Sequence, residues 1–208
     1  MDDIQATILD RLRGSGGGKA FTPKDFLDVG RRDAVDQALS RLVRKGDICR
    51  LGRGLYYYPR TNPRLGIAVQ PDIDDIADAL ARKTGTRIAP SGATAANRLG
   101  LSTQVPAKPV YLTDGRSRRV QVGDTEIVIK HAAPKNLPIG SGISATVIQA
   151  LRYIGRDAVT PEVVSRIRRK LSGTQKAQLR NDSRYIIDWI ADTVRLIVNK
   201  EEEVVAHG

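Results

Sequence analysis

The chain of 208 residues has few cysteines, aromatic residues and histidines, and each scarcity excludes a class of protein. Cys49 is the single cysteine, so no disulfide can form within the chain and a reducing compartment is expected. Aromatic residues make up 4% of the sequence, so the core must consist mainly of Leu, Ile, Val and Ala. His131 and His207 are the only histidines, and neither has a second metal ligand at useful spacing. The sequence therefore predicts no metal site and no cofactor.

Long apolar segments are also missing. No uninterrupted apolar run approaches the roughly 20 residues that a membrane-spanning helix needs. The first residues, Met1-Asp2-Asp3, lack the basic and apolar regions of a signal peptide. These two observations predict a cytoplasmic protein with no membrane partner.

Motifs for nucleotide chemistry are incomplete. Residues 14–19 resemble a phosphate-binding loop, but Arg13 replaces the first glycine, Ala20 replaces the Ser or Thr, and a predicted helix precedes the segment. Gly140-Ser141-Gly142 resembles the opening of a nucleotidyltransferase site, yet residues 136–151 contain no carboxylate to hold magnesium. Because no nucleophile–base pair can be identified either, we predict that the chain is not an enzyme.

Positive charge is what the sequence has in excess. It contains 34 Lys and Arg residues against 23 Asp and Glu residues, which gives a net charge of +11 and a pI of about 10.1. An excess of this size favours a polyanionic partner, most often nucleic acid, although a basic protein without such a partner is the alternative. Residues 1–66 carry 13 basic and 8 acidic side chains, and residues 152–184 carry 9 and 3. The charge therefore lies in two blocks.

The first block has the pattern of a winged helix-turn-helix. Apolar residues at helical spacing predict helices over 3–13 and 31–45, and Thr22-Pro23 predicts the start of a short helix between them. Residues 48–59 contain two short strand-like runs around a Gly-Arg-Gly turn, which predicts a β-hairpin. Three helices followed by a hairpin is the order of a winged helix-turn-helix, and we assign residues 1–66 to this domain.

The third predicted helix is the expected reader of DNA. One of its faces carries Val35, Leu39 and Leu42, and the opposite face is polar. Arginine pairs with guanine and glutamine with adenine, neighbouring cations bind phosphates, and a residue at a hairpin tip can enter the minor groove. A solvated helix face is the alternative. The predicted DNA-binding residues are Arg31, Arg32, Gln37, Ser40, Arg41, Arg44, Lys45, Arg50 and Arg53.

Residues 67–208 are expected to form a mixed domain with a small antiparallel sheet and several helices, which makes the whole chain α+β. A connector is predicted over 60–70, around the start of this domain. Strand-like alternation within 108–132 predicts a three-stranded meander. Apolar spacing and capping residues predict helices that start near Asp72 and that span 92–99, 143–154, 161–171, 174–181 and 183–200.

The second basic block lies on these predicted helices and forms a possible second surface. It could bind the DNA backbone, a nucleotide-bearing RNA or an acidic protein, and a solvated face is an equal alternative. Its residues are Arg166, Arg168, Arg169, Lys170, Lys176, Arg180 and Arg184.

Three stretches resemble the AbiEi-like antitoxin family. Residues 48–58, ICRLGRGLYYY, resemble its wing, and residues 90–106, PSGATAANRLGLSTQVP, resemble the start of its second domain, with VYLTDG at 110–115 continuing the match. The resemblance covers most of residues 1–135. It implies an antitoxin of a type IV toxin–antitoxin system that represses its own operon by binding inverted repeats in the promoter.

The same resemblance implies that residues 67–208 counter a nucleotidyltransferase-like toxin, either by direct binding or indirectly. The alternative is a winged-helix transcriptional regulator, or a DNA-associated interaction module, that has no toxin partner.

Overall fold

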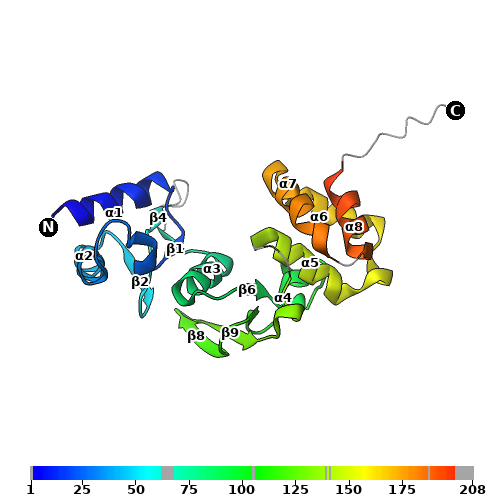
Figure 1. Cartoon of the computed structure of the whole chain (residues 1–208), viewed down its shortest axis with the longest axis horizontal. Helices are drawn as coiled ribbons and strands as arrows, with labels where there is room; N and C mark the ends of the chain where they lie inside the picture. The colour runs from blue at the N-terminus through cyan, green and yellow to red at the C-terminus, as the bar shows by residue number, and fades with distance from the viewer. Residues whose placement is uncertain are drawn as a thin grey trace. The chain divides into compact units, whose positions relative to one another are not determined.

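Figure 1 shows the computed structural model, which describes residues 2–61, 68–104, 106–138, 140, 142–186 and 188–199. Within these residues lie eight α-helices and nine β-strands, which confirms the predicted α+β class. The chain forms two compact units, one of Met1–Ile88 with Gly115–Ile129 and one of Ala89–Asp114 with Lys130–Gly208. The boundary predicted between residues 66 and 67 lies outside the described residues, as does part of the predicted connector.

Two long helices of the first unit follow the predicted apolar spacing. α1 spans Asp2–Gly14 and α2 spans Arg32–Lys45. α2 ends at Gly46, whose φ of 79° lies in the left-handed region that favours glycine. Each buried aliphatic or aromatic side chain of the shared core contributes roughly 1.5–3 kcal/mol. This core consists of Ile8, Leu12, Phe21, Phe26, Val35, Ala38, Leu39, Leu42, Ile48 and Tyr56.

The short helix predicted between them is a single 3₁₀ turn, η1, at Pro23–Phe26. Phe26 is buried and its ring packs edge-on against Phe21, with 5.4 Å between the centroids. Leu27, the next residue, is 46% exposed. Leu27 therefore adds no buried apolar contact that would support a second helical turn directly after Phe26.

Three strands complete this part of the first unit. They are β1 at Ala20–Phe21, β2 at Cys49–Gly52 and β3 at Leu55–Tyr57, in the order β1-β3-β2. β2 and β3 pair antiparallel and form the predicted hairpin. β3 is the central strand and all three of its residues are buried. A second small sheet pairs β4, Arg60–Thr61, with β5, Ala68–Val69.

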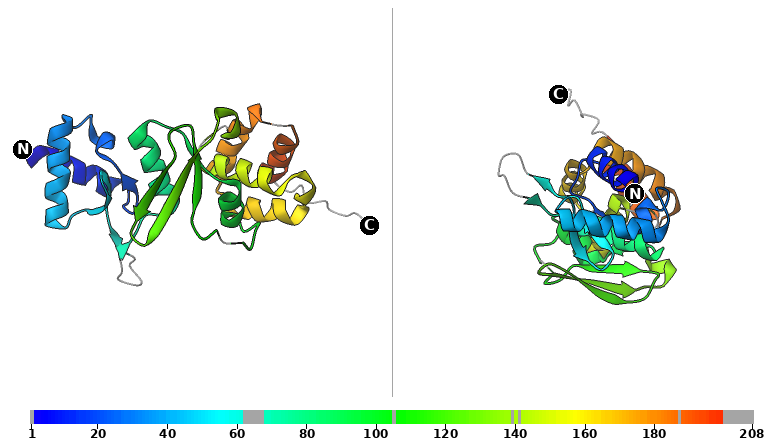
Figure 2. Two further views of the ribbon diagram at one scale, coloured as in Figure 1. Left: turned by 90° about the horizontal axis from the view of Figure 1, so that it is seen from below. Right: turned by 90° about the vertical axis from the view of Figure 1, so that its left-hand side faces the viewer.

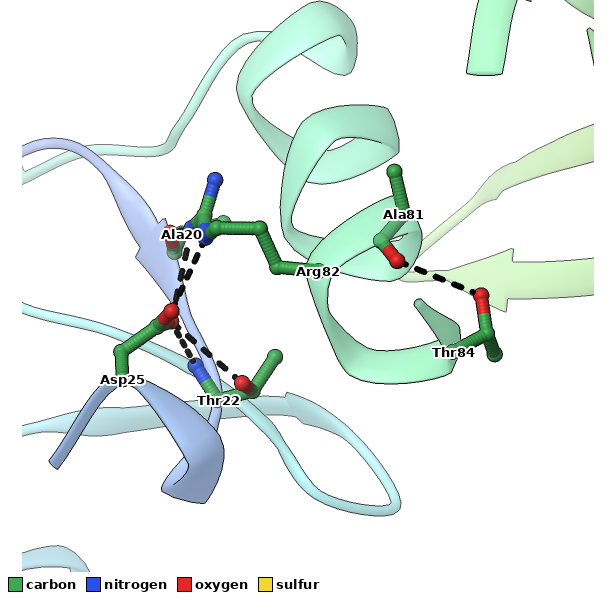
Figure 3. Close-up of polar contacts among 6 residues, drawn as sticks. All are labelled: Ala20, Thr22, Asp25, Ala81, Arg82 and Thr84. Atoms are coloured by element: carbon green, nitrogen blue, oxygen red, sulfur yellow. Dashed lines mark hydrogen bonds and ion pairs between the residues drawn. The ribbon is translucent and has the colours of Figure 1, made fainter. Parts of the chain in front are cut away.

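α3, at Ile73–Thr84, also belongs to the first unit. It begins where predicted, with the Asp72 side chain accepting a 2.8 Å hydrogen bond from the backbone N–H of Asp75. At its other end Arg82 donates to Asp25 Oδ1 at 2.9 Å and to the Ala20 carbonyl at 3.1 Å (Figure 3). Asp25 also accepts from the Thr22 N–H at 2.8 Å. These bonds join α3 to β1 and η1.

The strands predicted as a meander are connected differently. A four-stranded sheet runs in the order β6-β7-β9-β8, with β6 at Ile88–Pro90, β7 at Val110–Thr113, β8 at Arg118–Val122 and β9 at Thr125–His131. The meander prediction is wrong because β9, not β8, pairs with β7. The tight turn after Val122 does join β8 and β9 as expected, with Val122 opposite Thr125. Local turn signals specify such a hairpin but not which strand lies on its other side.

The described part of the second unit contains five helices around one apolar core. They are α4 at Gly92–Arg98, α5 at Gly142–Ile154, α6 at Pro161–Lys170, α7 at Gly173–Asp182 and α8 at Asp188–Val198. Figure 2 shows α5 to α8 gathered together, in yellow to red. Short 3₁₀ turns lie at Pro134–Asn136 and Arg156–Ala158.

The last predicted helix, over 183–200, is interrupted. The chain makes a 3₁₀ turn at Ser183–Tyr185 before α8 begins at Asp188. Ile186 between them has extended backbone angles, with φ of −110° and ψ of 170°. The prediction from apolar spacing therefore identified buried residues in this segment correctly, but its single continuous helix was wrong.

Candidate nucleic-acid interface

The solvent-facing side of α2 presents four of the predicted DNA-binding residues. Gln37, Ser40, Arg41 and Arg44 are spaced by three, one and three positions, so they share one helix face. Gln37, Ser40 and Arg44 are exposed and Arg41 is half-buried. Among the residues that the structure describes, neither arginine forms an ion pair. The opposite side of the helix is buried, which holds this face in a defined orientation.

The beginning of α2 is different, because its cations are paired. Arg32 Nε lies 2.8 Å from Asp36 Oδ2, and Arg31 Nε lies 3.6 Å from Asp33 Oδ1. All four side chains are exposed, so each pair is screened by water and contributes little to stability. The pairs nevertheless neutralise the first turn locally. The unpaired charge of α2 therefore lies in its second half, where Lys45 is also exposed.

The hairpin carries the remaining two predicted residues. Arg53 is exposed in the turn between β2 and β3, and Gly54 after it has a φ of 63° that favours glycine. Arg50 lies over the ring of Tyr56, 5.5 Å from its centroid, and donates to the Tyr56 hydroxyl at 3.2 Å. Arg50 is thus oriented by Tyr56 on the neighbouring strand, whereas Arg53 is exposed in the turn.

A basic residue that the sequence analysis did not select stands next to this turn. Lys83, in the last turn of α3, donates a hydrogen bond from Nζ to the carbonyl oxygen of Arg53. Burial lowers the pKa of Lys83, and the nearby charges of Arg118, Arg53 and Arg32 lower it further. The charge count over residues 67–107 is balanced, so no sequence signal distinguished Lys83 from an ordinary basic residue at a helix end.

The second basic block is largely engaged with backbone carbonyls. Arg168 donates to the carbonyl oxygens of Leu196 at 2.5 Å and Ile197 at 3.3 Å, at the end of α8. Lys170 Nζ donates to the Arg98 carbonyl at 2.6 Å, at the end of α4. The last carbonyls of a helix have no partner within the helix, and cations satisfy them well.

The other members of this block do not form one continuous group. Arg166 donates to the Gly100 carbonyl, just after α4, and Arg180 donates to Asn199 Oδ1 at 2.8 Å. Arg169, Lys176 and Arg184 have no partner among the described residues. The structure therefore uses at least four of the seven predicted residues in contacts within the second unit.

The remaining sequence candidates are the two histidines and the two glycine-rich segments. His131 ends β9 and is exposed, while His207 and Ser141 lie outside the described residues. Within the described ranges no three His, Cys, Asp or Glu side chains come close enough to hold a metal ion. Gly18, in the segment that resembles a phosphate loop, donates its N–H to the Tyr58 carbonyl at 2.9 Å. No helix in the described part of the chain is both long and apolar enough to cross a membrane.

Comparison with protein families identifies a match over most of the chain. A family model described as "Family of unknown function (DUF6088)" matches residues 7–179, which begin within α1 and end within α7. No curated protein matches the chain. The matched range covers α2, the hairpin and the basic residues described above, except Arg180 and Arg184.

Proposed function

We propose that this chain, which belongs to the DUF6088 family, binds double-stranded DNA through an N-terminal winged helix-turn-helix and represses its own operon. In this proposal α2 is the recognition helix and the β2–β3 hairpin is the wing. The observation that carries the proposal is the exposed face of α2, where Gln37, Ser40, Arg41 and Arg44 lie opposite a fully buried face.

The chemistry of that face suits base edges and phosphates. Arginine can donate two hydrogen bonds to guanine and glutamine can bond adenine in the major groove, which is wide enough to admit a helix. Arg41 and Arg44 have no carboxylate partner among the described residues, so DNA binding would not have to break an ion pair to recruit them. Lys45 and Arg31 flank the face and would bind backbone phosphates.

The hairpin supports the same proposal. Arg53 extends from a turn one residue before Gly54 and would enter the minor groove or bind its phosphates. Lys83 fixes the backbone of Arg53 by its bond to the carbonyl oxygen. The charges of Arg32 and Arg53 both lower the pKa of Lys83. The start of α2 and the proposed wing therefore both place positive charge near Lys83.

A salt-dependent binding titration of the full chain tests this function. The chain's own upstream DNA is compared with a scrambled duplex of equal length, from about 50 to 200 mM salt. We expect tight binding that prefers the upstream DNA by at least about a thousandfold, which is the usual ratio for a specific site. If binding is weak, independent of sequence and steeply weakened by salt, the basic charge supports only non-specific electrostatic binding. The autorepressor proposal would then fail.

The antitoxin role is a further part of the proposal and depends on the resemblance at residues 90–106 and 110–115. Several residues there make structural bonds. Thr94 Oγ1 accepts from the Val110 N–H at 3.1 Å, the Ser91 N–H donates to the Val110 carbonyl at 2.8 Å, and Arg98 bonds the Tyr111 hydroxyl. We propose that the region containing this framework counters a nucleotidyltransferase-like toxin.

The neighbouring gene distinguishes an antitoxin from a regulator without a toxin. We expect a downstream reading frame that encodes a nucleotidyltransferase-like protein, whose expression alone arrests growth and whose co-expression with this chain does not. If no such frame exists and the DNA titration succeeds, the chain is a winged-helix regulator and the antitoxin part of the proposal fails.

A further inference from the structure

A pocket of about 320 Å³ lies within the first unit, beside the hairpin turn. Its walls come from three places that are distant in sequence: the hairpin, the end of α3 and strand β8. Leu55 and Leu80 are buried and form apolar wall, and Lys83, Arg118 and Arg119 add positive charge together with Arg53. We call this site the basic pocket. Among the described residues its lining contains no Asp or Glu.

We propose that the basic pocket binds a phosphate group. The group would belong either to a free phosphate compound or to the backbone of a nucleic acid, because both present the same oxyanion. The proposal stands apart from the proposed base-reading face of α2, and its first test contains no DNA.

Among the described residues, Lys83 and Arg118 of the basic pocket are not paired with a carboxylate. Lys83 makes its hydrogen bond to a backbone carbonyl rather than to a carboxylate. Among the described residues, Arg118 Nη2 donates to the Leu80 carbonyl at 3.5 Å and to Thr84 Oγ1 at 3.4 Å, and both distances are long for hydrogen bonds. Arg118 Nε is buried and has no partner among the described residues. A guanidinium that is held so loosely by neutral groups retains bonding capacity for an anion.

Like charges held together in a partly buried place raise the free energy of the empty site. Burial lowers the pKa of both Lys83 and Arg118, and Arg118 and Arg53 lower that of Lys83 further. An oxyanion between them would relieve this repulsion and accept charge-assisted hydrogen bonds.

The size and composition of the basic pocket suit a phosphate group on a small carrier. Ligand sites have volumes of roughly 300–1,000 Å³ and combine apolar walls with a few polar groups. Arg119 is partly balanced by Glu126, whose Oε1 lies 3.8 Å from its Nη1. Lys83 and Arg118 are therefore the residues on which we expect binding to depend most.

The first experiment measures binding of inorganic pyrophosphate to the full chain by calorimetry and by thermal shift, with chloride added to keep ionic strength constant. The variants are Lys83→Gln and Arg118→Gln. Lys24→Gln is the matched control, because Lys24 is exposed on η1 and outside the pocket. We expect saturable binding that weakens about tenfold or more in each pocket variant, the usual loss for one charge-assisted bond, and is unchanged in the control.

The second experiment titrates the same variants with duplex DNA at several salt concentrations. If the phosphate belongs to a nucleic acid, each pocket variant lowers affinity equally for upstream and scrambled DNA and reduces the salt slope by about one. Pyrophosphate binding without this change identifies a free phosphate compound as the source. The inference is overturned if pyrophosphate does not bind and the DNA salt slope of Lys83→Gln and Arg118→Gln equals that of Lys24→Gln.

These results separate the two proposals. If the unmodified chain binds upstream and scrambled DNA equally well, the autorepressor proposal fails. The phosphate-site proposal still stands in that case, provided that pyrophosphate binds. Folding of each variant is checked by its unfolding temperature. Removal of one like charge from the basic pocket should keep that temperature the same or raise it slightly at low salt.

Discussion

Helices α2 and α6 each carry four basic residues, and their side chains meet different partners. On α2, Arg32 is paired with a carboxylate, while Arg41, Arg44 and Lys45 have no ion-pair partner among the described residues. On α6, Arg166, Arg168 and Lys170 donate to backbone carbonyls at the ends of other helices. The charge density of a segment therefore does not reveal whether its cations are available to a ligand.

The difference has a structural cause. The ends of α4 and α8 lie against α6, and their last carbonyls need donors. Among the described residues, no hydrogen bond joins a cation of α2 to the end of another helix, so these cations meet carboxylates of the same helix or solvent. Arg166, Arg168 and Lys170 are thus engaged within the fold, whereas Arg41, Arg44 and Lys45 remain available for binding.

The largest expected effect tests whether the cations of α2 are available to bind DNA. Arg41→Ala should weaken binding to the chain's own upstream DNA by about 1–3 kcal/mol, or roughly 5- to 150-fold, because one good base contact is lost. Filter binding or fluorescence anisotropy at fixed salt measures the change. Lys24→Gln, which removes one exposed charge on η1, should leave specific affinity within about twofold. Unchanged affinity in Arg41→Ala at matched salt would remove this residue from the proposed reading face.

A smaller effect tests the structural use of charge on α6. Arg168→Gln should lower the free energy of unfolding by about 1–2 kcal/mol, since two carbonyls at the end of α8 lose a charged donor that is partly exposed. Its neighbour Arg169 is exposed, and Arg169→Gln should change stability by no more than about 0.5 kcal/mol. Urea unfolding measures both.

DNA affinity in the same α6 variants sharpens the comparison. If Arg168→Gln reduced DNA binding as much as Arg41→Ala while stability stayed constant, the two helices would be used alike and the distinction drawn here would be wrong.

The smallest effect concerns a cation of the first unit that is paired at the surface. Arg11 donates to both oxygens of Asp28 at 2.9 and 2.7 Å, and these bonds lower the pKa of the Asp28 carboxyl. A lowered pKa means that the pair stabilises the fold above the carboxyl's ordinary pKa and loses this contribution as pH falls through the lowered value. Asp28→Asn should therefore reduce the unfolding temperature slightly near pH 7.

The pH dependence is the check on that pair. The difference in unfolding temperature between Asp28→Asn and the unmodified chain should shrink steadily as the carboxyl becomes protonated in acid. A difference that stays constant with pH would show that the lost contribution is packing rather than charge. High salt should reduce it at neutral pH, because both side chains are exposed.

Local sequence signals predicted the elements of the proposed DNA-binding region well. The apolar spacing in α2 and the glycine at its end were sufficient to locate that helix, since both act within a few residues. The Gly-Arg-Gly turn located the hairpin in the same way. The short helix after Thr22 was overestimated because its length depends on whether Leu27 reaches the core, which is a question of packing.

Longer-range features were beyond such signals. The order β7-β9-β8 depends on which strand pairs with the outer side of a hairpin, and periodicity is the same for either choice. The residues of the basic pocket come from positions 53, 83, 118 and 119, and only the fold brings them together. The sequence alone therefore did not indicate that Lys83 and Arg118 line the same pocket.

By itself, the sequence determined the α+β composition, the helix with one buried and one polar face, the hairpin beside it and the basic net charge. Each of these depends on residue type or on spacing within one element. Tertiary structure alone decided which cations are engaged by helix ends, which strand lies between its neighbours and where four separate basic residues meet. The physical reason is that a hydrogen bond or a charge acts over a few ångströms in space, whatever the separation of its partners along the chain.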